Sequence, residues 1–225
     1  MEWPWFDGLP EEDVRRVIAI ARRWTFARNE VVFHEHDPAD TLHLICTGRF
    51  AMSVATGLGD AAILAVLGPG EMFGELGLLG PDERRGGTVS ALEAGETLSV
   101  HRIDFERLRG EHPEVGDVLI AILSGQVRRL SRHLLDALYV TAEQRVLRRL
   151  AEVSEIYAVD ADGDGDSGVV VPLTQEHLAD MAGTSRATAN RVLREQADRG
   201  LVELRRGRTI VRDADALRAR AGQAS

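Results

Sequence analysis

The chain has 225 residues, of which 44% are apolar and 28% are charged, as in an ordinary globular protein. This length can bury one large core or two smaller ones, and we expect two. The apolar runs are too short to span a bilayer and the acidic N-terminal segment lacks the pattern of a secretion signal, so we expect a cytoplasmic protein without membrane contact. The single cysteine, Cys46, excludes an intrachain disulfide and an iron–sulfur cluster held by cysteines of one chain.

The net charge of −9 at pH 7 is unevenly distributed. Residues 1–141 carry 14 Arg and 22 acidic residues, whereas residues 172–225 carry 10 Arg and only 7 acidic residues. A basic C-terminal region on an acidic body suits local contact with phosphate groups.

The N-terminal half predicts one helix and then a set of short strands. "LPEEDVRRVIAIARRW" has the proline-and-acid start and the apolar spacing of an amphipathic helix. From about Val31 to Arg102, alternating apolar and polar residues between glycine-containing turns predict a small antiparallel barrel. "IDFERLRGEHPEV" then predicts a short helix that stops at Gly110.

The clearest periodicity lies between Val118 and Val140. Apolar residues recur there at alternating steps of three and four, which is the a/d spacing of a coiled-coil seam; they are Ile120, Leu123, Val127, Leu130, Leu134 and Ala137. A buried helix of a bundle is the alternative. We favour a parallel dimer seam, because no other long helix is expected nearby to bury these side chains.

A second helix, "AEQRVLRRLAEVSEIY", leads to the acidic stretch "VDADGDGDSG". Asp160, Asp162, Asp164 and Gly165 match the first half of a calcium-binding EF-hand loop. The bidentate glutamate that should end the loop is Val171 instead, within the strand-like "GVVVPL". We therefore expect a solvated glycine-rich turn, which also forms a natural domain boundary.

The C-terminal region predicts a helix-turn-helix followed by a two-stranded wing. "TQEHLADMAG" is a short helix with Thr174 as N-cap, and "SRATANRVLREQADRG" is a second helix with Ser185 as its cap. "LVELRRGRTIVR" supplies the wing. A helical hairpin with a solvated arginine face is the alternative, but the order of helix, turn, helix and basic hairpin favours a DNA-binding module.

The exposed face of the second helix has the chemistry to read bases. Arginine can bond guanine bidentately, asparagine can do the same to adenine, and an alanine methyl can pack on thymine. We expect base contacts from Arg186, Ala187, Asn190 and Arg191. Around them we expect further DNA contacts, chiefly to phosphates, from Thr174, Ser185, Arg205, Arg206 and Arg208.

With "GEMFGELGLLG" and "RRGGTVSALE" in the barrel, the long helix, and "GTSRATANR" in the last module, the chain resembles the catabolite activator/FNR (CRP/FNR) family of bacterial transcription regulators. The resemblance implies an α+β fold: a cyclic-nucleotide-binding-type β-barrel (jelly roll) over residues 1–115, a dimerisation helix over 116–140 and a winged helix-turn-helix over 141–225. It also implies a homodimer that binds a palindromic operator in double-stranded DNA, with RNA polymerase as a further partner. A small molecule in the barrel would re-aim the DNA-reading helices.

The resemblance also implies which residues would hold that molecule. In the cyclic-nucleotide-binding members, a glycine-glutamate turn holds the ribose and an arginine pairs with the cyclic phosphate. Carried over by motif, Glu75 would accept from a ribose hydroxyl, and Gly74 and Leu76 would offer backbone groups. Arg85 would pair with the phosphate, or Arg84 if the loop differs by one residue.

Three departures from the family pattern bear on function. Gly86 stands where a hydroxyl-bearing residue is expected, and losing a hydrogen bond to an anion costs about 1.5–3 kcal/mol. The central helix should supply a Thr-Ser pair to adenine, but here reads "VRRLSRHLL", so that Ser131 is one candidate and Arg128 and Arg129 are others. Ala187 replaces the family's glutamate beside Arg186, so we do not expect the family's best-known operator to be favoured.

The effector is therefore open. Cyclic AMP is the first expectation, another anionic nucleotide or metabolite the second, and a ligand-free barrel the third.

A signalling adaptor without DNA activity is disfavoured by the second C-terminal helix. The sequence holds no catalytic triad, no phosphate loop and no metal-spaced cluster, so we expect neither an enzyme nor a metal site.

Overall fold

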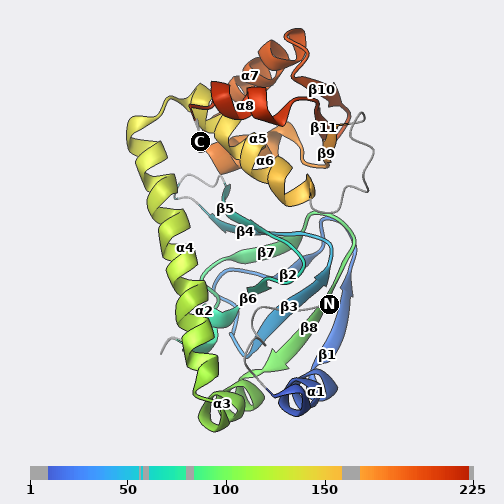
Figure 1. The fold of residues 1–225 in the computed structure, drawn as a ribbon, viewed down its shortest axis with the longest axis vertical. Coiled ribbons are helices and arrows are strands. Elements are labelled where there is room, and N and C mark those ends of the chain that lie inside the picture. Colours follow the sequence, from blue (N-terminus) through green and yellow to red (C-terminus); the bar gives the residue numbers. More distant parts are fainter. Residues whose placement is uncertain (1–9, 56, 58–60, 80–83, 159–167, 223–225) are drawn as a thin grey trace. The chain divides into compact units, whose positions relative to one another are not determined.

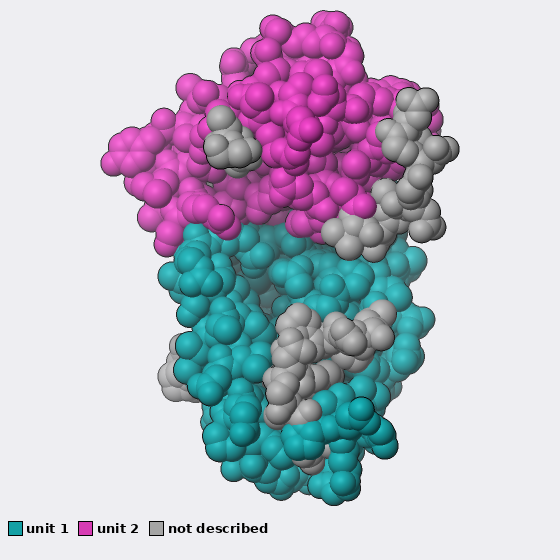
Figure 2. All heavy atoms as spheres, in the orientation of Figure 1, with its two compact units in different colours: residues 1–55, 64–130 teal, residues 56–63, 131–225 magenta. Residues whose placement is uncertain are grey.

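The computed structural model describes residues 10–55, 57, 61–79, 84–158 and 168–222 (Figure 1). Two compact units are distinguished in Figure 2, residues 1–55 with 64–130 and residues 56–63 with 131–225. No helix among the described residues is both long enough and apolar enough to cross a membrane.

The first unit contains two four-stranded sheets, ordered β1-β8-β3-β6 and β2-β7-β4-β5 (Figure 1). The strand pairs whose register the structure gives are antiparallel. This arrangement confirms the predicted jelly roll. The strands are β1 (Arg22–Phe26), β2 (Val31–Phe33), β3 (Thr41–Thr47), β4 (Phe50–Ala55), β5 (Ala61–Leu67), β6 (Met72–Phe73), β7 (Thr88–Ala91) and β8 (Gly95–His101).

The first helix is shorter than the sequence predicts. Helix α1 covers Glu11–Ile20, and the chain is extended from Ala21 onward. The segment expected to end the helix instead forms β1, which pairs with β8 and places Trp24 opposite Thr97. The indole of Trp24 donates to Ser99 Oγ at 3.0 Å. Pairing with a distant strand has overridden the local helical pattern, which is a usual effect of tertiary context.

An aromatic cluster fills the space between the two sheets. Phe26, Phe50 and Phe73 are buried, and the rings of Phe26 and Phe50 meet edge to face at 5.8 Å. His43 stacks on Phe73 with ring centres 5.0 Å apart. Burial, reinforced by the nearby Arg85 cation, lowers the pKa of His43 to about 3, so this ring is neutral in the folded protein.

One short helix lies between strands β6 and β7, and two helices follow β8. They are α2 (Glu75–Leu79), α3 (Arg102–Glu111) and α4 (Glu114–Tyr139). Phe105 of α3 and Val115 of α4 are completely buried in one apolar cluster with strand residues. Further along α4 the predicted seam is exposed instead: the exposed fractions are 64% for Ile120, 62% for Val127 and 60% for Leu134. No described element of the chain buries these side chains, which argues against the bundle alternative.

The second unit is built around α5 (Ala142–Ala158). Its other elements are α6 (Gln175–Ala182), α7 (Arg186–Asp198), α8 (Ala214–Arg220), and a three-stranded antiparallel sheet of β10 (Val202–Arg205), β11 (Arg208–Val211) and β9 (Val169–Val171). The acidic stretch with Asp160, Asp162, Asp164 and Gly165 lies outside the described residues. Val171 is fully buried in β9.

A buried ion-pair network joins the end of α4 to α5. Asp136 accepts hydrogen bonds from Arg148 and, at 2.8 Å, from Arg149. Arg149 also donates to Glu152 at 2.6 Å. Burial alone would raise the pKa of Glu152, but hydrogen bonds from His133 and Arg149 outweigh it and lower the pKa to about 2. The network fixes the turn between the two helices, because an unpaired buried charge would be costly.

Candidate effector pocket and nucleic-acid interface

A cavity of about 90 Å³ lies in the first unit, among the barrel strands, α2 and α4. Most of its walls are apolar, as is usual for a small-molecule site. Its charged and amide side chains come from α2, from the segment before β7 and from α4. The residues that line it are Phe33, Met52, Leu64, Ala65, Leu67, Met72, Phe73, Gly74, Glu75, Leu76, Gly77, Arg85, Gly86, Gly87, Val89, Gln126, Arg129 and Leu130.

The turn before α2 requires glycine at position 74. Gly74 has φ +89°, and a Cβ there would lie 2.6 Å from Nη1 of Arg85 and 3.0 Å from the carbonyl oxygen of Thr41. This close approach brings Glu75 to the first turn of α2, where it is only 3% exposed. Its Oε1 accepts a hydrogen bond from Nε2 of Gln126 at 3.0 Å. Burial raises the pKa of Glu75, and this hydrogen bond partly opposes the rise.

Arg85 is a buried cation that is hydrogen-bonded through both Nη nitrogens but not through Nε. Its side chain is 4% exposed, and its guanidinium carbon lies 4.1 Å from the ring centre of Phe33. Nη1 donates to the carbonyl oxygen of Thr41 at 2.5 Å and Nη2 to its hydroxyl at 2.8 Å, with Asp40 at 3.7 Å. Nε is buried and has no partner among the described residues. Burial lowers the pKa of Arg85, and an anion in the pocket would oppose that effect.

The neighbouring arginine points elsewhere. Arg84 is exposed, donates to the carbonyl oxygen of His36 at 2.8 Å and forms a β-bridge with Pro38. It is not among the residues that line the pocket. The geometry therefore favours Arg85 over Arg84 as the phosphate partner, a choice that the sequence left open.

The two glycines after Arg85 differ in the space around them. A Cβ at Gly86 would meet no atom of a described residue within 4 Å, and the φ of Gly86 lies outside the left-handed region. A Cβ at Gly87 would lie 2.8 Å from the carbonyl oxygen of Ser53. Gly87 is thus required by the backbone of β4, whereas position 86 has room for a hydroxyl-bearing side chain beside Arg85.

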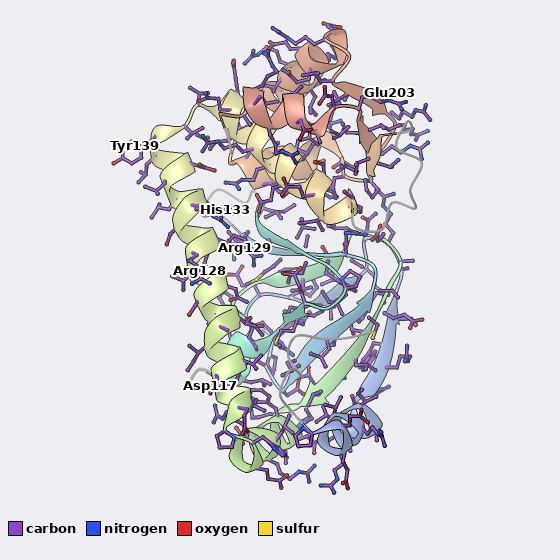
Figure 3. All side chains as sticks on the ribbon, viewed as in Figure 1. Asp117, Arg128, Arg129, His133, Tyr139 and Glu203 are labelled. Atoms are coloured by element: carbon purple, nitrogen blue, oxygen red, sulfur yellow. The ribbon has the colours of Figure 1, made fainter. Side chains whose placement is uncertain are left out.

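Helix α4 contributes Gln126, Arg129 and Leu130 to the pocket, and not Ser131, among the described lining residues. Figure 3 shows Arg129 on the side of α4 that faces the strands, whereas Arg128 is exposed. Ser131 is also exposed. Sequence reasoning missed Gln126, although its spacing of three and four from the other two lining residues places it on the same helix face.

In the second unit, α6 and α7 form the predicted helix-turn-helix. Thr174 caps α6 by accepting from the backbone N–H of His177 at 3.1 Å. Ser185 caps α7 by accepting from the backbone N–H of Thr188 at 3.1 Å. Gly183 ends α6 in the left-handed conformation, with φ +57°. The start of α6, the end of α6 and the start of α7 thus lie where the sequence predicts them.

The candidate base-reading residues are not equally accessible. Arg186 and Ala187 are exposed, and Arg186 makes no ion pair with any described residue. Asn190 is half-buried, and its Oδ1 has no hydrogen-bond partner in the described part of the chain. Arg191 is bound by two carboxylates, Glu143 of α5 and Glu195, the latter at 2.8 Å. DNA would have to compete with these two ion pairs for Arg191.

The wing and the helix starts surround one groove of about 290 Å³. Five predicted DNA-binding residues line it: Thr174, Arg186, Arg205, Arg206 and Arg208. Arg205 also donates to Glu203 at 2.5 Å. The structure adds Gln175, which the sequence argument did not single out. Converging arginines beside a helix N-terminus form an electrostatic environment that suits a phosphate backbone.

Comparison with known proteins identifies a domain in each half of the chain. Residues 23–112 match the model of the cyclic nucleotide-binding domain, and residues 144–220 match that of the Crp-like helix-turn-helix domain. The chain is 31% identical to the cyclic AMP receptor protein of Thermus thermophilus, over 94% of this chain and 93% of that protein. It is 29% identical to the CRP-like cAMP-activated global transcriptional regulator of Mycobacterium tuberculosis, over 96% and 95% of the two chains.

The fold also matches a solved structure. The c-di-GMP responsive global regulator CLP of Xanthomonas campestris superposes with a TM-score of 0.78, at 21% identity, over 90% of this chain and 99% of that one. At this identity the likeness concerns the fold alone.

A cyclic nucleotide-binding domain and a helix-turn-helix in one chain define a DNA-binding transcription regulator rather than an enzyme. The chain belongs to the CRP/FNR family. Within the described residues there is no group of three or more His, Cys, Asp and Glu that could hold a metal ion.

Proposed function

We propose that this protein is a homodimeric regulator whose DNA binding is controlled by a cyclic nucleotide in the barrel pocket. The observation that carries the proposal is that the buried guanidinium of Arg85 and the buried carboxylate of Glu75 line one pocket. A guanidinium and a carboxylate in one apolar pocket suit a cyclic phosphate and a ribose hydroxyl, respectively. The names of two relatives, which refer to cyclic AMP, support the same class of ligand.

A ligand-free barrel is the second candidate, and one observation favours it. Thr41 already holds both Nη groups of Arg85, and Gln126 already holds Glu75. The pocket could therefore be held together by its own hydrogen bonds. The charge of Arg85 favours an anionic ligand over this alternative, because its hydrogen bonds go to neutral oxygens of Thr41 and the carboxylate of Asp40 lies 3.7 Å away.

The exposed seam of α4 supports a dimer. Val127, Leu130, Leu134 and Leu138 are between 47% and 63% exposed and recur at steps of three and four. A two-fold dimer would read two half-sites of a palindromic operator about one helical turn apart. RNA polymerase, the further partner that the family resemblance implies, stays a prediction.

Replacing Leu134 by glutamate should dissociate the dimer, because it places a charge in an apolar seam. Sedimentation velocity should show the wild type with the mass of two chains and Leu134→Glu with the mass of one. Ile103→Glu is the matched control, since Ile103 of α3 is 67% exposed and lies outside the seam. A monomeric wild type, or a dimer that tolerates Leu134→Glu, would contradict the proposal.

Gly86→Ser should strengthen binding of a cyclic nucleotide, because it adds a hydroxyl donor beside Arg85 in open space. The expected gain is about 1.5–3 kcal/mol, or roughly tenfold to over a hundredfold in affinity. Isothermal calorimetry with cyclic AMP measures it, and Arg85→Ala should abolish the heat. Gly87→Ser is a control that should weaken binding or folding, because its Cβ meets Ser53. A Gly86→Ser variant with unchanged affinity would show that the phosphate lies elsewhere.

Replacing Arg186 or Arg208 by alanine should change DNA binding in two different ways. Arg186→Ala should lose a guanine preference worth about 1–3 kcal/mol, because we place this side chain on a base edge. Arg208→Ala should weaken all sequences alike and flatten the salt dependence, because we place it on a phosphate. Competition binding to variant operators at several salt concentrations separates the two effects. An unchanged base preference in Arg186→Ala would remove that residue from the base-reading set.

A further inference from the structure

A second cation of the effector pocket, Arg129, makes no hydrogen bond with any described residue. It lines the pocket together with Arg85, and its side chain is only 25% exposed. The carboxylate that pairs with it is that of Glu71, whose Oε1 lies 3.9 Å away and thus beyond hydrogen-bond distance. The donors of Arg129 are therefore available to a group that enters the pocket.

The acidic side chains near Arg129 are already held by other groups. Glu71 accepts from the backbone N–H of Gly68 at 2.8 Å through Oε2. Glu75 accepts from Gln126 at 3.0 Å. The charge of Arg129 opposes the rise that burial causes in the pKa of both carboxylates, but neither accepts a hydrogen bond from it, so its N–H donors remain for a ligand.

The chemistry of the guanidinium indicates what it would recognise. Its N–H donors form a planar fork and it has no acceptor, so it matches two adjacent acceptor atoms. Guanine presents such a pair in N7 and O6, whereas adenine presents the N7 acceptor next to an N6 amino donor. An arginine facing adenine would place a donor against a donor.

We propose that the pocket prefers a cyclic nucleotide of guanine over one of adenine, with Arg129 as the residue that determines this specificity. The inference rests on the proposed function, because it assigns the cyclic phosphate to Arg85 and leaves Arg129 for the base. It differs from the cyclic AMP that the family resemblance implies. The guanine edge is common to cyclic GMP and to a cyclic dinucleotide of guanine, and both serve as probes.

The test is calorimetric titration of the 225-residue protein with cyclic GMP, cyclic di-GMP and cyclic AMP. At least one guanine ligand should bind about tenfold or more tightly than cyclic AMP, as expected for a bidentate contact to guanine. Arg129→Ala should remove most of that preference. Arg128→Ala is the matched control, because it removes the same charge from the adjacent, exposed position of α4 and should leave the preference unchanged. Arg129→Gln, which keeps more of the side chain, provides a second variant should the alanine variant unfold.

The outcomes separate this inference from the proposed function. If cyclic GMP binds more tightly than cyclic AMP, the ligand is a guanine mononucleotide. If only cyclic di-GMP binds, the ligand is a cyclic dinucleotide that presents the same N7 and O6 atoms of guanine. If cyclic AMP binds as tightly as both guanine ligands or more so, the specificity inference fails and the proposed function stands. Equal weakening of all ligands in Arg129→Ala would make Arg129 a phosphate contact and also overturn the inference. If no ligand binds, the proposed function itself fails.

Discussion

The effector pocket depends on one constraint, a guanidinium buried inside an apolar barrel. Burying a charge is costly unless it is hydrogen-bonded, so the surroundings of Arg85 must supply acceptors and space. Thr41 supplies both a carbonyl and a hydroxyl oxygen, and Phe33 covers the flat face of the guanidinium. Position 74 favours glycine, because its φ is +89° and a Cβ would lie 3.0 Å from the carbonyl oxygen of Thr41, the same oxygen that accepts from Arg85. The turn that places Glu75 in the pocket is therefore packed directly against the residue that holds Arg85.

Helix α4 combines two surfaces, because adjacent helical residues point in directions about 100° apart. Gln126 and Arg129 line the pocket, whereas Val127 between them is 62% exposed on the seam. A ligand that changes the position of Arg129 would act on the same helix that carries the proposed dimer contact. Binding of a ligand in the barrel would therefore change the geometry of the dimer through α4 itself, and no further chain of side-chain contacts is needed.

The sequence predicted the local features well and the long-range contacts poorly. The barrel strands, the exposed apolar row along α4 and the caps Thr174 and Ser185 follow from periodicity and from residue type, and the structure contains them. The choice between Arg84 and Arg85 depends on a bridge to Pro38, which is distant in the chain. Arg191 pairs with Glu143, which is 48 residues away in the sequence, and β1 forms because it pairs with the distant strand β8. No pattern within a single segment could reveal these contacts.

If occupancy of the barrel pocket changes DNA binding, the operator affinity must depend on the nucleotide. Fluorescence anisotropy would give the affinity for an operator selected from random DNA, with and without the cyclic nucleotide that binds in calorimetry. We predict that the nucleotide changes the dissociation constant of the wild type by about fivefold or more, as is typical of allosteric coupling, and leaves Arg85→Ala unchanged. Equal affinity of the wild type with and without a saturating nucleotide would contradict the claim.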